Sequence, residues 1–152
     1  FMFKIKIYYP TKEEEKEIVK RMSVSQSITM EKVLHPEDIF RIRKLIEQIY
    51  IDDKLQDYII DLIFATREPQ KYKLPLENII QFGASPRASI NLTKAAKARA
   101  FLNNRGYVTP KDVKEVAYDI LRHRILLSYE AEAENITQDD VITRIFDKLE
   151  VP

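Results

Sequence analysis

The chain of 152 residues lacks cysteine altogether and contains only two glycines. Without cysteine it can form no disulfide, no thiolate metal site and no thiol nucleophile. Tight β-hairpins depend on glycine, so this composition favours helices. Charge of either sign is not in excess, since 25 basic residues face 24 acidic ones and the net charge is +1. A dedicated nucleic-acid-binding protein usually has a clear basic excess, and we therefore expect no nucleic-acid partner.

Other absences narrow the chemistry further. No apolar run approaches the length of a membrane span and nothing resembles a signal peptide, so we expect a cytoplasmic protein without membrane insertion. No segment fits the phosphate-binding pattern G-x-x-x-x-G-K-[ST], so the chain alone should not hydrolyse a nucleotide. The two histidines, His35 and His123, are expected in structural or surface roles. The glutamates of "YEAEAE" (129–134) alternate with alanine, which is typical of a solvated face rather than a metal site.

What the sequence does contain is helical periodicity. Apolar residues recur at helical spacing after six N-capping positions, and this predicts about six helices packed through mostly short connections. The predicted helices begin near Thr11, Pro36, Asp52, Ser85–Pro86, Thr109–Pro110 and Thr137. Residues 23–29 are polar and predict a loop, residues 70–82 an irregular connection, and "LLSYEAEA" (126–133) either a short extended piece or a helix end. The expected fold class is therefore mostly α, a helical bundle.

The first residues depart from this pattern. "FKIKIYY" (3–9) alternates apolar and basic or polar residues, which is the period of a half-buried strand. One strand needs a partner, so it either belongs to a sheet outside this chain or pairs with a short segment later in it. The chain opens with Phe1 instead of methionine, and we expect it to be a piece of a longer protein.

Arg87 is the residue that most needs an explanation. In "GASPRASINLTKAAKARAFL", Ser85 is predicted to cap a helix and Pro86 to occupy its first turn. A cation at the next position lies at the positive end of the helix dipole, which is locally unfavourable. Either Arg87 pairs with an acid or reaches water, or it serves an anion such as a polyphosphate, which helix N-termini attract. Asn91 and Lys94 share its face, and Ala88, Leu92, Ala95 and Ala96 form the opposite, close-packing side.

Much of the chain resembles one family. "GASPRASINLTKAAKARAFLNNRGYVTPKDV" and "LRHRILLSYEAEAENITQDDVI" are similar to the C-terminal lid of MoxR-family AAA+ ATPases, and "IYIDDKLQDYIIDLIFATREP" resembles the segment before it. The resemblance implies that Arg87 is the sensor-2 arginine, which contacts the γ-phosphate of the nucleotide. It makes Ser85 and Pro86 nucleotide-binding positions as well, with Asn91 and Lys94 as possible support.

The same resemblance implies an organisation and a function. Residues 1–10 would be the last strand of the AAA+ core, residues 11–70 connecting helices, and residues 71–152 the lid. The full-length protein would bind ATP and Mg²⁺, assemble as a ring, expected to be a hexamer, and remodel substrates in a chaperone-like way. Its partners would be the AAA+ core of the same chain, neighbouring subunits and proteins with von Willebrand factor A domains. Whether Arg87 acts in cis or in trans stays open.

The sequence departs from the family pattern in two places. Tyr8 and Tyr9 stand where the family often has an acidic residue, and "NNRGYV" (103–108) replaces the common "NGRDYV", which alters the turn after the sensor-2 helix. Walker A and Walker B are absent, so we expect this chain to be catalytically inactive and to hold no cofactor. The alternative is a stand-alone helical interaction module, or a helix-turn-helix DNA-binding module built around residues 109–126, where "LRHR" supplies basic charge.

Overall fold

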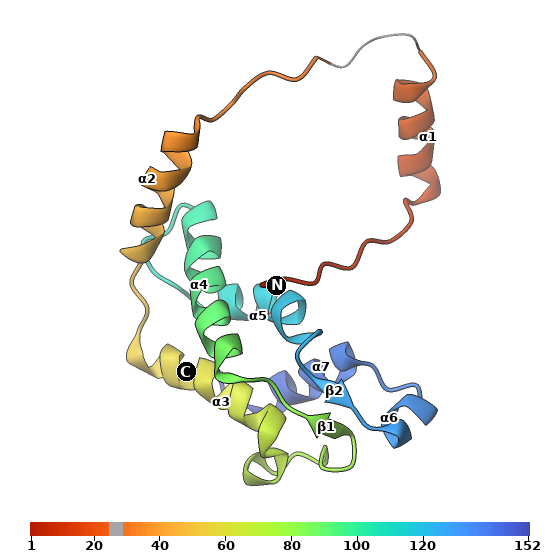
Figure 1. The fold of residues 1–152 in the computed structure, drawn as a ribbon, viewed down its shortest axis with the longest axis vertical. Coiled ribbons are helices and arrows are strands. Elements are labelled where there is room, and N and C mark those ends of the chain that lie inside the picture. Colours follow the sequence, from red (N-terminus) through yellow and green to blue (C-terminus); the bar gives the residue numbers. More distant parts are fainter. Residues whose placement is uncertain (25–28) are drawn as a thin grey trace.

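The computed structural model describes residues 1–24 and 29–152 (Figure 1). Helices dominate these residues, so the mostly α fold class is confirmed, with seven α-helices in the described part of the chain rather than about six. The elements in chain order are α1 (Lys12–Met22), α2 (Pro36–Glu47), α3 (Asp53–Arg67), the 3-10 helix η1 (Pro69–Tyr72), β1 (Ile80–Phe82), α4 (Pro86–Leu102), α5 (Pro110–Leu121), β2 (Leu126–Leu127), α6 (Tyr129–Ala133) and α7 (Gln138–Lys148).

The helix starts follow local capping chemistry. A carboxylate three residues into the helix accepts the backbone N–H of the N-cap residue in α2, α5 and α7. These carboxylates belong to Asp38, Asp112 and Asp140, the third helical positions of the three similar sequences "HPEDI", "TPKDV" and "TQDDV". Reciprocal bonds of this kind satisfy amides that a helix end would otherwise leave unpaired. These short similarities therefore reflect a shared cap.

The core is formed by α3, α4, α5 and α7 with the small sheet beside them. Alanines give α4 a flat buried face, because Ala88, Ala95, Ala96 and Ala100 are at most 3% exposed and Leu92 is fully buried. Small side chains let neighbouring backbones approach closely, and α4 accordingly packs against both α3 and α5. The alanine side of this helix is thus buried as the sequence predicts.

β1 lies where the sequence predicts an irregular connection, and β2 lies in a segment for which a short extended piece was one of two alternatives. β1 pairs with β2 in antiparallel register, with Ile80 opposite Leu127 and Phe82 opposite Leu126. The strands are too short for a periodic signal, because three and two residues do not complete a recognisable alternation. Residues 126–133 contain the strand β2 followed by the short helix α6, so the extended alternative holds for the first residues of "LLSYEAEA" and most of the remainder is helical.

The strand expected at residues 3–9 does not form. The segment is irregular and largely exposed, with 69% of Ile5 and 92% of Ile7 accessible to solvent. No described strand lies beside it to supply the ladder hydrogen bonds that hold a strand in place. Its N-terminal end instead reaches α5, while α1 stands away from the other helices (Figure 1).

Burial begins at Ile49. Neither α1 nor α2 has a buried residue, whereas α3 buries seven of its fifteen residues, in contact with α4, α7 and β1. In this structure α3 thus shares one core with the elements after residue 70, and packing does not divide at residue 71. Of the loop predicted at residues 23–29, residues 25–28 lie outside the described part of the chain.

The turn after α4 uses asparagine where the resembling sequences have glycine. Asn104 has a positive φ of 55°, and Gly106 does not. Arg105 donates its N–H to the carbonyl of Ala100, and Asn104 donates to Phe101, both at 2.9 Å. This is the Schellman arrangement that commonly ends helices, and asparagine tolerates its left-handed position better than other residues with a Cβ. The altered sequence therefore still forms a regular helix end.

Candidate functional site

The N-terminus of α4, where the sequence places its candidate residues, is fixed by contacts with α3. A Cβ added at Gly83 would overlap the backbone carbonyl of Thr66 and lie 2.8 Å from the Cγ of Arg67. Glycine is therefore required here by the close approach of two backbones, and its φ is not positive. The loop before α4 consequently lies directly against the last turn of α3.

Thr66 forms the second contact. Its Oγ1 accepts the N–H of Ala84 at 2.9 Å and donates to the carbonyl of Ile63 at 2.7 Å. The side chain is 1% exposed, and a buried hydroxyl with both bonds satisfied holds its partners firmly. Sequence reasoning missed Thr66, since a threonine near the end of an apolar helix has no distinctive pattern.

Ser85 and Pro86 begin α4 as predicted, but Ser85 does not cap it through its side chain. Ser85 has the extended backbone of an N-cap residue, and Pro86 takes the first helical position. The Ser85 hydroxyl makes no capping hydrogen bond, so the predicted side-chain cap is wrong. The positive end of α4 is thus left without the side-chain acceptor that the N-termini of α1, α3 and α7 have.

Arg87 projects from this end into solvent. It is exposed, and within residues 1–24 and 29–152 no hydrogen bond or ion pair engages its guanidinium. An internal salt bridge, one of the two open explanations for this arginine, is thus not found in the described chain. No acidic partner within residues 1–24 and 29–152 offsets the unfavourable charge of Arg87 at the helix dipole.

Asn91 and Lys94 continue the same side of α4. Asn91 is half-buried and Lys94 is exposed, at spacings of four and seven residues from Arg87, which places the three on one helical face. Ser85 and Pro86 precede these residues at the exposed start of the same helix.

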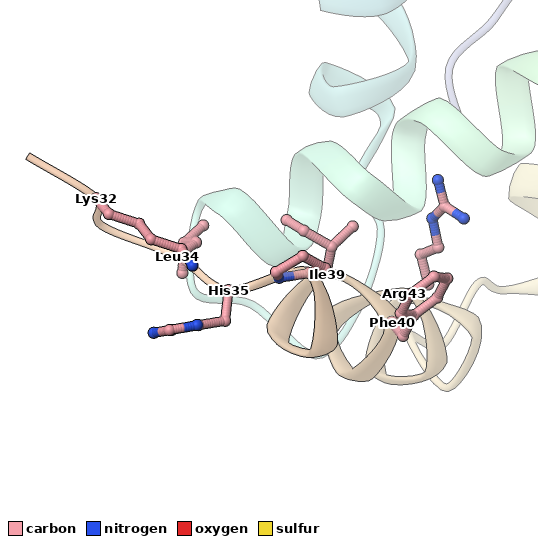
Figure 2. Close-up of a pocket in the computed structure, with 7 residues that line it drawn as sticks. Lys32, Leu34, His35, Ile39, Phe40 and Arg43 are labelled. Atoms are coloured by element: carbon pink, nitrogen blue, oxygen red, sulfur yellow. The ribbon is translucent and has the colours of Figure 1, made fainter. Parts of the chain in front are cut away.

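One cavity borders the N-terminal end of α4, and another lies on α2. One of about 240 Å³ lies beside Gly83 and is lined by polar side chains, among them Arg67, Gln70 and Glu77. A larger one of about 540 Å³ lies on α2 and contains none of the candidate residues. Figure 2 shows Ile39 and Arg43 projecting from α2 toward its neighbouring helix, whereas His35 points the other way. The α2 cavity is lined mainly by Lys32, Leu34, His35, Ile39, Phe40 and Arg43.

The described residues offer no metal-binding cluster of histidine and acidic side chains. The glutamates of "YEAEAE" lie on α6 or just after it and are exposed. His35 is the N-cap residue of α2. His123 follows α5, where burial and the nearby guanidinium of Arg124 lower its pKa.

The basic "LRHR" segment is occupied within the chain. Arg122 is only 8% exposed and donates to Asp119 at 2.7 Å and to Asp139 at 2.8 Å. Burial raises the pKa of Asp139, but hydrogen bonds from Arg122 and Lys6 outweigh it and lower the pKa overall. The charge on which a helix-turn-helix interpretation depends is thus largely used in internal contacts.

A second internal ion pair closes the turn between α4 and α5. Arg105 donates from both terminal nitrogens to the two carboxylate oxygens of Asp112, whose side chain is 1% exposed. Burial raises the pKa of Asp112, but hydrogen bonds from Arg105 and Thr109 outweigh it and lower the pKa to about 2. Asp112 thus serves both as a cap and as the partner of Arg105, and no sequence pattern indicated this ion pair.

Comparison with known proteins identifies the kind of domain that contains α4 and α5. Residues 76–145, which include all of α4 and α5, match the family model described as the AAA lid domain. The chaperone MoxR1 of Mycobacterium tuberculosis is 38% identical over the whole of this chain. The chain corresponds to the C-terminal region of MoxR-family AAA+ proteins.

Two further proteins match the whole chain. The uncharacterised protein YeaC of Bacillus subtilis is 33% identical over the whole chain. The crystal structure of a Cytophaga hutchinsonii protein described as a candidate ATPase is 47% identical and superposes over the whole chain with a TM-score of 0.95. The chain spans 40% of MoxR1, 45% of YeaC and 47% of the Cytophaga protein.

Proposed function

We propose that this chain is the lid region of a MoxR-like AAA+ ATPase, in which Arg87 acts as the sensor-2 arginine. The observation that carries the proposal is the position of Arg87: an exposed arginine at the N-terminus of a long helix that lacks a side-chain cap. The match of this segment to the AAA lid domain supports the same assignment.

The electrostatics of the site suit a polyphosphate. In the free chain the charge of Arg87 and the dipole of α4 repel each other. An anion at this position would be attracted by both, because free backbone amides and a guanidinium can donate to the same phosphate oxygens. Arginine remains charged and can donate two parallel hydrogen bonds, which lysine cannot. Ser85 and Pro86 would form the rim of this contact, with Asn91 and Lys94 as further support.

The described residues fit only one part of an ATP site. Arg87 can contact a terminal phosphate, but the sequence contains no phosphate-binding loop and the described residues include no acidic cluster for Mg²⁺. We therefore assign ATP and Mg²⁺ to the full-length protein, whose AAA+ core would bind them while the lid closes over the nucleotide. Arg87 would stabilise negative charge on the phosphate, in cis or toward a neighbouring subunit of a ring, expected to be a hexamer.

Lid movement would couple the nucleotide state to remodelling of a substrate, consistent with the word chaperone in the name of the Mycobacterium relative. Partners would include neighbouring subunits and proteins with von Willebrand factor A domains. No described helix has both the length and the apolar content to cross a bilayer, and we propose a cytoplasmic location.

Arg87→Ala in the full-length protein tests the assignment. The melting temperature should stay within the error of wild type, because Arg87 is exposed and leaves no cavity when truncated. ATP turnover should fall about ten- to a hundredfold, the equivalent of one charge-assisted phosphate contact. Arg87→Lys should recover part of the activity, and Arg144→Ala, which removes an exposed arginine of α7, should leave turnover unchanged.

Two outcomes would contradict the proposal. Normal turnover in Arg87→Ala would remove Arg87 from the nucleotide site. A clear drop in melting temperature with normal turnover would assign the residue a structural role instead.

A further inference from the structure

Backbone atoms of the first residues form hydrogen bonds with Asp119 of α5 and with two arginines that follow this helix. Arg124 donates from Nη2 to the carbonyl of Phe1 at 2.6 Å and from Nη1 to that of Met2 at 3.2 Å. Arg122 donates to the carbonyl of Lys4 at 2.8 Å, and Lys4 returns its own N–H to the carbonyl of Asp119 at 2.7 Å. These four hydrogen bonds thus fix Phe1, Met2 and Lys4 to a site more than a hundred positions away in sequence.

Both arginines also form hydrogen bonds with α5, and Arg122 does so with α7 as well. Arg122 joins Asp119 of α5 to Asp139 in the first turn of α7. Lys6 pairs with the same Asp139 at 2.6 Å, and Arg124 also donates to the carbonyl of Ile120 at 2.6 Å. Residues 1–6, α5 and α7 are therefore connected in one polar network, and we call residues 1–6 the anchored segment.

Contacts weaken abruptly beyond Lys6. Tyr8 and Tyr9 are 77% and 99% exposed, and α1 buries no residue. The attachment is therefore local to the anchored segment. Most of its hydrogen bonds are to backbone carbonyls and one backbone amide. The attachment therefore depends on the course of the backbone more than on particular side chains.

We propose that Arg122 and Arg124 are positioning residues that couple the lid to the chain segment entering it. The anchored segment moves with α5 and α7 as one body, so that a change in lid position displaces the residues before α1. The whole-chain superposition on the Cytophaga structure, of which this chain spans 47%, indicates that the same placement occurs in a longer protein. The consequence for ATP turnover rests on the function proposed above, whereas the attachment itself is a property of this chain.

Hydrogen exchange of single backbone amides tests the attachment. In the 152-residue chain, the amide of Lys4 should exchange slowly because it donates to Asp119. Arg124→Ala should speed this exchange about five- to tenfold, as expected for loss of one anchoring contact. Lys6→Ala, at a partly exposed residue whose removal does not threaten the core, should have the same direction of effect. The control Arg144→Ala should leave it unchanged, as should amides of α4 in every variant.

Steady-state kinetics of the full-length protein test the coupling. Arg124→Ala should lower kcat by at least about threefold, a typical strength of coupling through a packed network. The KM for ATP should change less than about twofold, because uniform binding is untouched when a residue does not contact the nucleotide. Arg124→Lys, which keeps one donor to the anchored segment, should restore part of kcat.

The results separate the two proposals. Rapid exchange of the Lys4 amide in wild type would overturn the attachment, and unchanged kcat in Arg124→Ala would overturn the coupling. If wild-type full-length protein hydrolysed no ATP, the proposed function would fail, while the exchange measurement would still decide whether the attachment exists.

Discussion

Helices α1 and α7 begin with the same kind of cap but differ in how they are packed. Both have eleven residues, and both start from a threonine in a capping box, Thr11 with Glu14 and Thr137 with Asp140. Yet α7 buries four apolar residues and α1 buries none. The cap decides where a helix begins, and packing against neighbours decides whether it belongs to a core.

The apolar patterns of the two helices do not explain the difference. Ile18, Val19 and Met22 of α1 have the same spacing as Val141, Ile142 and Ile145 of α7, and each set forms one face of its helix. The α7 face meets α3 and α5, whereas the three α1 side chains are 48–69% exposed. Under the proposed function, the ATPase core would cover the α1 face.

The largest expected effect on stability comes from truncating a buried isoleucine of the core, and an exposed isoleucine of α1 provides the comparison. Ile63→Ala in α3 should lower the free energy of unfolding by about 2–5 kcal/mol, because a fully buried side chain leaves a cavity. Ile18→Ala should change it by less than about 0.5 kcal/mol. Urea unfolding of both variants measures this, and equal losses would mean that α1 is packed in solution.

Acid should affect the two regions differently. Asp112 has its pKa lowered from 3.8 to about 2 in the folded state. Its stabilising contribution is therefore complete above pH 3.8 and is lost as the pH falls toward 2, a change of about 2 kcal/mol. Asp112→Asn should remove this part of the acid dependence and be less stable at neutral pH.

The exposed Glu14 of α1 provides the comparison, because hydrogen bonds from Thr11 also lower its pKa. Glu14→Gln should leave the acid dependence of global unfolding unchanged. Unfolding measured from pH 7 to pH 2 compares the variants, and a wild-type slope retained in Asp112→Asn would assign the acid sensitivity to another group.

A smaller effect should come from the two threonine caps. Thr137→Ala should lower the free energy of unfolding by about 1 kcal/mol, since it removes the acceptor for the Asp140 amide. Thr11→Ala should speed amide exchange within α1 and leave the cooperative unfolding transition in place. Thermal unfolding and amide exchange distinguish the two results, and a shifted transition in Thr11→Ala would show that α1 shares the core's stability.

Helix positions could be predicted because their signals are local. Pro36, Pro86 and Pro110 mark first turns, and acidic residues close the caps within three positions. The strand at residues 3–9 could not be judged in this way, because alternation describes a face and says nothing about the presence of a partner strand. β1 was missed for the opposite reason, since it is defined by pairing and not by periodicity, and only its pairing with β2 decides between the alternatives left open at residues 126–127.

The same distinction between local signals and long-range contacts applies to the candidate site. Arg87, the helix start before it and the alanine face opposite it follow from residue types and spacing within about ten positions of the chain. The absence of a Ser85 side-chain cap could not be inferred from spacing. Spacing also does not reveal the hydrogen bonds of Thr66 with Ala84 and of Arg124 with Phe1. They depend on segments that are 18 to 123 residues apart meeting at hydrogen-bond distance, and only the packing of α3, α4, α5 and α7 brings those segments together.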